Sequence, residues 1–160
     1  AAYSRVIIGK KRIDIWDTAG QERYLSLSPM YYRGSQVILL VFDLSKLDTI
    51  DRIDYYLDKI QYLEDKNFQC IIVGTKLDLI DSYVLTKREK LIKDRLEKYN
   101  SSLKNKLKFV YVSSKYSINY DKLKDMIIES CDEDDDVIES NVLRLEDDKN
   151  EKKENSNCSC

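Results

Sequence analysis

Hydrophobic positions divide this chain into segments with strand-like and helix-like spacing. Three buried strands are predicted at residues 36–43, 68–73 and 107–112. The first contains a continuous apolar run at residues 37–42, which is typical of a strand covered on both faces in a parallel sheet. Elsewhere apolar residues recur every three or four positions, which predicts helices with one buried face. The expected core-facing residues are Ile50, Ile53, Leu57, Ile60 and Leu63, then Ile92, Leu96, Tyr99 and Leu103, then Tyr120, Leu123, Ile127 and Cys131. This alternation predicts an α/β fold with a doubly wound, mostly parallel sheet.

A hairpin is predicted ahead of this α/β pattern. Residues 3–8 and 11–16 have strand spacing, and Gly9-Lys10 between them suits a tight turn with glycine at its first central position. Ile13 and Ile15 alternate with polar residues, as at the end of a buried strand.

Polar residues indicate where the helices begin. Asp48-Thr49 is expected to open the first long helix, and Thr86 with Glu89 matches a capping box at the start of the second. The last helix is expected from about Asn119, and a short helical segment around residues 28–33.

The composition excludes several classes of protein. A net charge of −2 gives no reason to expect a nucleic-acid partner, since nucleic acids bind strongly basic surfaces. No run approaches the roughly eighteen apolar residues of a transmembrane helix, and no signal peptide is visible. Because nothing signals secretion, the cysteines are expected to be reduced in a cytosolic protein, with Cys70 and Cys131 as small buried or half-buried residues.

The end of the chain differs from the rest. From Asp132 onward the sequence is dominated by acidic and polar residues that have little to bury. We therefore expect a folded domain at residues 1–134 and a disordered acidic tail at residues 135–160. The chain ends in Cys158-Ser159-Cys160, for which a metal-binding pair is one interpretation, although no histidine or other cysteine lies nearby.

Residues suited to phosphate chemistry follow the hairpin. Asp17 can hold a Mg²⁺ ion directly or through water, and Gly20 lets a backbone N–H approach a phosphate oxygen closely. Gln21 can orient an attacking water without having to titrate. An Asp-x-x-Gly sequence by itself would be only a strand followed by a polar turn.

Two further strand ends carry suggestive residues, at 75–78 and at 113–115. Ligands of open α/β sheets bind at the carboxyl ends of the strands, so these segments and residues 17–21 are expected to converge on one edge. The carboxylate of Asp78 can accept two parallel N–H bonds from guanine, a pair that adenine lacks. The apolar stem of Lys76 can lie on a base or ribose face.

The segment Ile-Trp-Asp-Thr-Ala-Gly-Gln-Glu-Arg-Tyr at 15–24 closely resembles the second switch of Ras-like small GTPases. Tyr-Tyr-Arg-Gly-Ser at 31–35 narrows the resemblance to the Rab branch, most like its early-endosomal members, and the resemblance covers about residues 1–131. It implies the G-domain fold of P-loop NTPases, with GTP or GDP and Mg²⁺ as ligands. Thr-Lys-Leu-Asp at 75–78 and Ser-Ser-Lys at 113–115 resemble the family's base-recognition motifs, with Thr75 where many members have Asn and Ser114 in place of Ala.

The resemblance also implies the role of individual residues. Gln21 would be the catalytic residue and Asp17 the metal-binding one. An aromatic triad of Tyr3, Trp16 and Tyr31 would bind effectors. The nucleotide-binding residues would be Asp17, Thr18, Ala19, Gly20, Thr75, Lys76, Asp78, Ser113, Ser114 and Lys115.

The function implied is a GTP-dependent switch that regulates vesicle and endosomal membrane trafficking. Its partners would be an exchange factor, a GTPase-activating protein, a GDP-dissociation inhibitor or escort protein, and trafficking effectors. Cys158 and Cys160 resemble the Cys-x-Cys ending that Rabs carry for double geranylgeranylation. The protein would then be anchored by lipid to the cytoplasmic face of endosomal or other secretory-pathway membranes, with a cytosolic pool.

One family motif does not occur in the chain. No Gly-x-x-x-x-Gly-Lys-Ser/Thr sequence is present, and the chain begins with Ala1. We therefore expect an N-terminally truncated G domain that lacks the phosphate-binding loop and the first switch, and that binds GTP weakly or not at all by itself. The alternative is a non-hydrolysing, Rab-like effector-binding module that keeps the aromatic triad.

Overall fold

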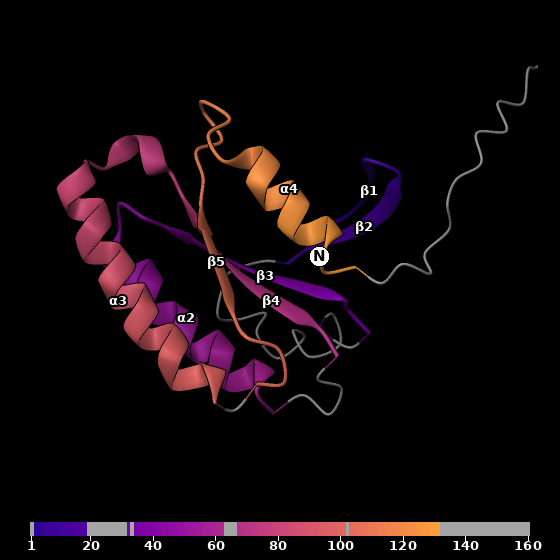
Figure 1. Cartoon of the computed structure of the whole chain (residues 1–160), viewed down its shortest axis with the longest axis horizontal. Coiled ribbons are helices and arrows are strands. Elements are labelled where there is room, and N and C mark those ends of the chain that lie inside the picture. The colour runs from indigo at the N-terminus through magenta and orange to yellow at the C-terminus, as the bar shows by residue number, and fades with distance from the viewer. Residues whose placement is uncertain (1, 19–31, 33, 63–66, 102, 132–160) are drawn as a thin grey trace, which may run out of the picture.

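The computed structural model describes residues 2–18, 32, 34–62, 67–101 and 103–131, which form two separate sheets and the helices around them (Figure 1). The first sheet is an antiparallel hairpin of β1 (Ala2–Ile8) and β2 (Lys11–Asp17). The second is parallel, in the order β3-β4-β5, and consists of β3 (Val37–Asp43), β4 (Gln69–Thr75) and β5 (Lys108–Tyr111). The predicted α/β class is confirmed.

Helices connect the parallel strands and cover both faces of their sheet. Helix α2 (Leu47–Ile60) joins β3 to β4, and a short 3₁₀ turn, η2 (Leu77–Leu79), precedes α3 (Ser82–Asn100), which leads to β5. Helix α4 (Tyr120–Ile128) follows β5. In Figure 1, α2 and α3 lie together on one side of the sheet and α4 lies on the other.

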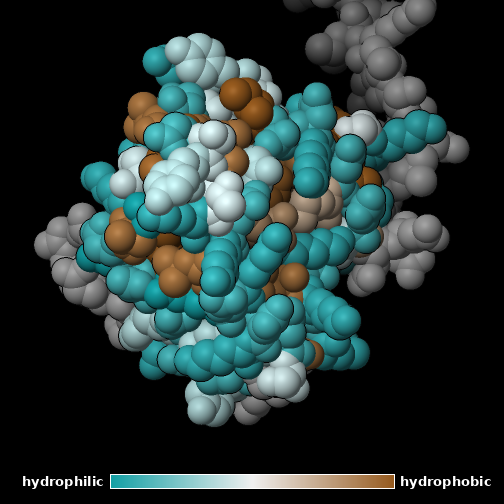
Figure 2. Space-filling view, turned by 60° about the vertical axis from the view of Figure 1, so that its left-hand side comes forward, coloured by the Kyte–Doolittle hydropathy of each residue, from teal (hydrophilic) through white to brown (hydrophobic). Residues whose placement is uncertain are grey.

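The core follows this layering. On one face, α2 and α3 pack against residues of the sheet, with Ile50, Leu57, Ile60 and Ile92 at most 1% exposed. On the other face, side chains of α4 contact Ile71, Val73, Val110 and Val112. The predicted apolar faces are therefore confirmed within α2, α3 and α4, whereas Leu103 and Cys131 lie beyond the ends of their helices. Leu63 and most of the segment at 28–33 lie outside the described residues. Seen from the side of α2 and α3, the outer surface of the molecule is mostly hydrophilic (Figure 2).

The prediction that β3 is covered on both faces is wrong. Residues 70–74 of β4 are buried on both faces, as expected. In β3, by contrast, Leu39 is 39% and Val41 62% exposed, while Ile38, Leu40 and Phe42 are buried. The reason is that α4, among the described residues, packs mainly on β4 and β5, while β3 lies at the edge of the sheet farther from β5. An edge strand with one covered face shows the alternating burial of a half-exposed sheet.

The predicted burial of the hairpin is also wrong. The turn itself is confirmed, since Ile8 pairs with Lys11 and Gly9 has φ +63°, a value that glycine adopts without strain. However, Ile15 is 40% exposed and Ile13 only half-buried. Among the described residues, no second layer covers the faces of this two-stranded sheet.

Helix α3 begins four residues before the predicted capping box. Asp81 is the residue that caps it, because its Oδ1 accepts a hydrogen bond from the backbone N–H of Val84 at 2.8 Å. Thr86 lies inside the helix and donates its hydroxyl to the carbonyl of Ser82, one turn back, at 2.9 Å. Leu103 packs against the core from beyond the end of α3.

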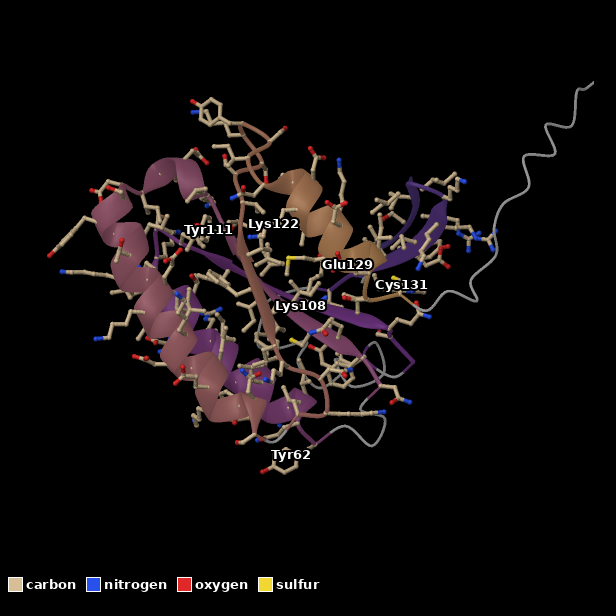
Figure 3. All side chains as sticks on the ribbon, in the orientation of Figure 1. Tyr62, Lys108, Tyr111, Lys122, Glu129 and Cys131 are labelled. Carbon is tan, nitrogen blue, oxygen red and sulfur yellow. The ribbon has the colours of Figure 1, made fainter. Side chains whose placement is uncertain are left out.

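Within the part of the chain that the structure describes, the hairpin contacts the end of α4. The ammonium of Lys11 donates to the carbonyl oxygens of Ile128 at 3.2 Å and Cys131 at 2.8 Å. A cation is favourable at a helix C-terminus, where carbonyl groups lack helical partners. Figure 3 shows Glu129 and Cys131 at this end of α4, and Cys131 lies beyond the last helical residue.

The structure confirms the prediction for Cys70 and Cys131, which are buried and half-buried. Burial raises the pKa of the Cys70 thiol to about 12, so this thiol is protonated at neutral pH. Within the described residues, no helix has the length and apolar character needed to cross a membrane.

Candidate functional site

The carboxyl ends of the three parallel strands form a shared edge. The register places Asp43 beside Thr75, and the backbone N–H of Leu44 donates to the Thr75 carbonyl at 3.0 Å. Past the end of β5, the N–H of Val112 donates to the Gly74 carbonyl at 2.7 Å, and the N–H of Leu77 donates to the Val112 carbonyl at 3.1 Å. The loops after β3, β4 and β5 are thus tied together by main-chain hydrogen bonds.

Asp78 is oriented by a residue from the next loop. The Ser113 hydroxyl donates to Oδ1 of Asp78 at 2.5 Å, and Ser113 is fully buried. The N–H of Tyr116 in turn donates to the Ser113 oxygen at 3.3 Å. Because each carboxylate oxygen can accept more than one hydrogen bond, Asp78 is held in orientation and keeps capacity to accept further donors.

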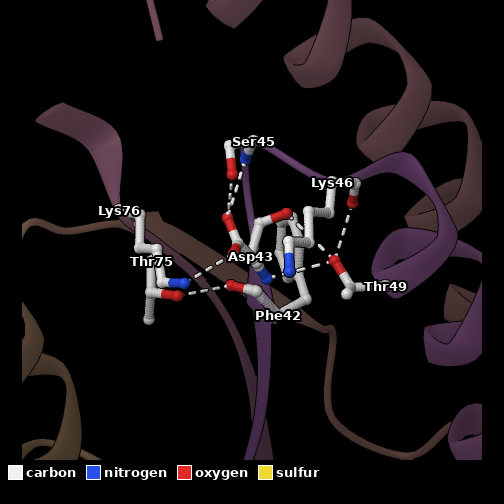
Figure 4. A network of polar contacts seen from close by, with 7 residues as sticks. All are labelled: Phe42, Asp43, Ser45, Lys46, Thr49, Thr75 and Lys76. Carbon is white, nitrogen blue, oxygen red and sulfur yellow. Dashed lines mark hydrogen bonds and ion pairs between the residues drawn. The ribbon is translucent and has the colours of Figure 1, made fainter. Parts of the chain in front are cut away.

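The side chains of Thr75 and Lys76 both contact the end of β3. The Thr75 hydroxyl donates to the Phe42 carbonyl at 2.7 Å and so joins the ends of β3 and β4. Lys76 has left-handed backbone angles, φ 59° and ψ 38°, which are uncommon for a residue with a side chain. Its ammonium pairs with Oδ2 of Asp43 at 2.8 Å (Figure 4).

Asp43 is a site residue that the sequence interpretation missed. Its Oδ1 accepts from the Ser45 backbone N–H at 2.9 Å and the Ser45 hydroxyl at 2.6 Å. Burial acts to raise the pKa of Asp43, but the hydrogen bonds from Lys76 and Ser45 outweigh it and lower the pKa to about 2. The sequence did contain a signal for this residue. Asp43 directly follows an apolar run, just as Asp17 and Thr75 follow the apolar segments before them.

The loop after β5 forms a closed turn. Ser113 and Ile118 exchange backbone hydrogen bonds at 3.1 and 3.2 Å, and Ser117 between them has φ 55°. Ser114 shares a hydrogen bond of 2.9 Å with the Tyr120 hydroxyl, and the ammonium of Lys115 lies 4.9 Å from the centroid of the Tyr116 ring. The loop therefore presents an ordered backbone beside Asp78.

Four of the predicted nucleotide-binding residues are brought together by these contacts, namely Thr75, Lys76, Asp78 and Ser113. Ser114 and Lys115 belong to the same turn as Ser113. Asp17 and Thr18 lie at the end of β2, in the other sheet. The expected convergence is confirmed for two of the three strand ends; Ala19, Gly20 and Gln21 lie outside the described residues.

The chemistry of this edge fits a guanine base better than a metal ion. It offers an oriented carboxylate and a long apolar stem, which are suited to paired N–H donors and a flat ring. Among the described residues, no group of three or more histidine, cysteine, aspartate or glutamate side chains could hold a metal ion. A single carboxylate such as Asp17 suits Mg²⁺ only where phosphate oxygens and water complete the ligand set.

The hairpin carries a second cluster, formed by Tyr3 and Trp16. These residues are direct cross-strand partners, with ring centroids 5.0 Å apart and planes tilted by 48°. They are 49% and 56% exposed. Asp14 accepts a hydrogen bond from the Tyr3 hydroxyl at 3.1 Å and is paired with Arg5 at 2.6 Å. Two of the three predicted effector residues thus form one exposed aromatic pair, whereas Tyr31 lies outside the described residues.

Comparison with known proteins is consistent with this geometry. The model of the Ras family matches residues 4–133. The chain is 35% identical to the Ras-related protein RABF2a of Arabidopsis thaliana, over 74% of this chain and 54% of the relative. It is 37% identical to the putative ras-related protein Rab-5B of Dictyostelium discoideum, over 61% of this chain and 42% of the relative. It is 43% identical to RABA4a of Arabidopsis thaliana, over 44% of this chain and 31% of the relative. The chain spans about half or less of the length of these relatives.

Proposed function

The chain belongs to the Rab branch of the Ras family of small GTPases, and we propose that it supplies the base-recognising part of a GTP-dependent switch in vesicle trafficking. The observation that carries the proposal is the placement of Asp78, which the buried Ser113 holds at the carboxyl edge of the parallel sheet. A carboxylate oriented in this way is complementary to the adjacent N1–H and N2–H₂ groups of guanine. Adenine offers an acceptor at N1 and no amino group at C2, so the same carboxylate would be left with an unfavourable partner.

We assign the neighbouring residues to supporting roles. The stem of Lys76 lies against the base or ribose, and Thr75 braces the end of β4 through the Phe42 carbonyl. Ser113 fixes the carboxylate, and the turn that includes Ser114 and Lys115 offers backbone N–H groups to the base. These roles use the apolar stem, the hydroxyls and the main chain, and none of them requires a proton transfer.

The switch residues are assigned from the family resemblance. Gln21 orients the attacking water, the N–H of Gly20 contacts the γ-phosphate, and Thr18 and Ala19 belong to the same loop. Asp17, at the end of β2, is the residue that would hold Mg²⁺, which supplies charge neutralisation on the phosphates when it is bound. Replacing Gln21 with Leu should slow single-turnover hydrolysis and leave GTP affinity nearly unchanged, because the amide acts in the transition state. An unchanged rate would contradict this assignment.

The experiment that tests the proposal changes one of the two carboxylate oxygens of Asp78 to an amide NH₂ group. Asp78→Asn replaces one acceptor with a donor, which suits xanthine, since xanthine carries a carbonyl at C2. In the longest natural polypeptide that contains these residues, GDP affinity should fall by about 100-fold and xanthosine diphosphate affinity should rise. The matched control is Asp81→Asn, because asparagine caps a helix as well as aspartate does. An unchanged ratio of the two affinities would overturn the proposal.

A second candidate function rests on the exposed pair of Tyr3 and Trp16. Stiff aromatic side chains with polar tips are typical of protein interfaces, so this face would bind a trafficking effector. In the GTP-switch function, Tyr31 joins this pair and binding depends on the nucleotide. In the non-hydrolysing module, binding does not depend on it. Effector capture in the presence of GDP and of a slowly hydrolysed GTP analogue separates the two functions.

Membrane attachment is proposed through Cys158 and Cys160, with the exchange factor, GTPase-activating protein and escort protein as further partners. Two long lipids retain a protein on a membrane far better than one, because each buried CH₂ contributes about 0.8 kcal/mol. Replacing both cysteines with serine should move the protein from the membrane fraction to the cytosol without changing its thermal melt. A single replacement should give an intermediate pool. A double variant that stays in the membrane pellet would show that the anchor lies elsewhere.

A further inference from the structure

The two carboxylate oxygens of Asp43 have different partners. Oδ1 accepts hydrogen bonds from the backbone N–H and the hydroxyl of Ser45, while Oδ2 pairs with the ammonium of Lys76 at 2.8 Å (Figure 4). One oxygen thus belongs to the turn after β3, and the other reaches across to the loop after β4. Oδ1 therefore has a local structural role in the turn, and Oδ2 can have a role at the proposed nucleotide site.

We propose that Asp43 is a positioning residue for nucleotide binding, which holds the ammonium of Lys76 so that the lysine stem is already in place at the base-recognising edge. The inference rests on the proposed function, because it assumes that a guanine nucleotide binds beside Asp78. It adds a residue from β3 to a site otherwise built from the loops after β4 and β5.

Lys76 needs such an anchor. Its side chain is 53% exposed, and a long exposed side chain samples many rotamers that binding would have to restrict. Holding the ammonium before the ligand arrives removes part of this loss in conformational entropy. The side chain of Asp43 is only 12% exposed, so the pair is less screened by water than a pair in which both partners are exposed.

The anchor itself is fixed on regular structure. The backbone N–H of Asp43 donates to the Thr49 hydroxyl at 3.2 Å. This hydroxyl can donate its single proton to the carbonyl of Lys46, at 2.7 Å, or of Asp43, at 3.0 Å. Thr49 belongs to the first turn of α2, and Asp43 is the last residue of β3. The backbone of Asp43 is therefore held by a strand and a helix, and its carboxylate by the turn at Ser45, while the ammonium of Lys76 pairs with that carboxylate.

The division between the two oxygens provides a clean test. Asp43→Asn keeps the Oδ1 acceptor for Ser45 but replaces the charged oxygen that faces Lys76. Ser45→Ala is the matched control, because it removes one bond to Oδ1 and leaves the pair with Lys76. In the longest natural polypeptide that contains these residues, Asp43→Asn should weaken GDP binding about fivefold, and Ser45→Ala should leave it unchanged. The preference for guanosine over xanthosine diphosphate should not change, because Asp78 determines it.

A second measurement does not depend on nucleotide. In the 160-residue chain, NMR relaxation at the Cε methylene of Lys76 should show greater mobility in Asp43→Asn than in the original chain or in Ser45→Ala. The GDP measurement is then repeated in a Lys76→Met background, where Asp43→Asn should have no further effect.

Each outcome is decisive. The inference would be overturned if Asp43→Asn weakened GDP binding equally with Lys76 and with Met at that position, or if it left the mobility of Lys76 unchanged. The proposed function would still stand in both cases. If the original polypeptide binds no guanine nucleotide, the proposed function fails, and the inference fails with it. Weakening that requires Lys76, together with its increased mobility, would support the positioning role.

Discussion

The hairpin and the parallel sheet of this protein contain similar residues in very different surroundings. Ile7 in β1 is 67% exposed, whereas Ile71 in β4 is fully buried. Both are isoleucines within strands, and both strands are paired in register with a neighbour. The difference arises because β4 lies between two strands and has helices on both faces. Among the described residues, the hairpin contacts the rest of the fold through Lys11 and the end of α4.

The burial of an apolar residue in a strand therefore depends on whether another layer of the fold covers that strand, and not on the strand itself. The parallel sheet forms the rigid edge at which Asp43, Thr75 and Asp78 are held by main-chain and side-chain hydrogen bonds. The hairpin places Tyr3 and Trp16 on an exposed face, where they are available to a partner. The two proposed tasks, binding a nucleotide and binding an effector, thus fall on regions with opposite degrees of burial.

The largest expected effect is on the core. Ile71→Ala removes a fully buried side chain and should reduce the free energy of unfolding by about 2–5 kcal/mol. Ile7→Ala in the hairpin is the matched control and should change it by less than about 0.5 kcal/mol. Urea denaturation of the two variants measures both values. Similar losses would show that the hairpin is covered in solution and that the comparison is wrong.

The next effect concerns the tight packing at the end of β4. A methyl group on Gly74 would lie 2.9 Å from Cγ and Cδ2 of Leu44 and 3.0 Å from Phe42. Gly74→Ala should therefore reduce the free energy of unfolding by about 1–3 kcal/mol through overpacking.

Truncating Leu44 tests the cause of this loss. In a Leu44→Ala background, Gly74→Ala should be less harmful than in the original chain, because the two nearest clashing atoms are gone and only the contact with Phe42 remains. Additive losses in the double variant would exclude the clash as the cause.

A smaller effect on the free energy of unfolding is expected at acid pH. Because the folded state holds the pKa of Asp43 at about 2, below its ordinary 3.8, this group stabilises the fold above about pH 4 and the stabilisation is lost as the pH falls toward 2. After allowance for the partly exposed Lys76, the contribution is about 1 kcal/mol. Stability measured from pH 5 to pH 2 should fall less steeply in Asp43→Asn than in the original chain.

The hairpin supplies the control for the acid experiment. Hydrogen bonding to Arg5 lowers the pKa of Asp14, but this pair is exposed and screened by salt. Asp14→Asn should therefore leave the pH dependence nearly unchanged at physiological ionic strength. If Asp14→Asn altered the pH dependence of stability more than Asp43→Asn does, the ion pair of the hairpin would matter more to stability than that of the parallel sheet, contrary to this comparison.

A small effect on stability is also expected for the aromatic pair. Tyr3→Ala and Trp16→Ala remove a contact between exposed rings, so each should reduce the free energy of unfolding by less than about 1 kcal/mol. If the pair binds an effector, the same substitutions should abolish capture of that effector. A large loss of stability would instead identify the rings as structural.

The sequence alone determined the order of the elements and the kinds of residue at the site. Apolar periodicity located β3, β4 and β5 and the buried faces of α2 and α3, because these patterns depend only on the repeat of strand and helix. The motifs at 75–78 and 113–115 predicted a base-binding edge, since parallel strands present their carboxyl ends on the same side. The start of α3 was misplaced because two residues in that stretch, Asp81 and Thr86, have side chains suited to capping, and local sequence does not say which one does so.

Only the tertiary structure decided which apolar residues are covered and which charged groups meet. Val41 and Ile15 are exposed because no layer of the described structure lies over them, and a strand pattern contains no information about its neighbours. The ion pair between Asp43 and Lys76 joins residues from two different strand ends, and its strength depends on a burial that the side chain of Asp43 acquires only when β3, β4 and α2 are assembled.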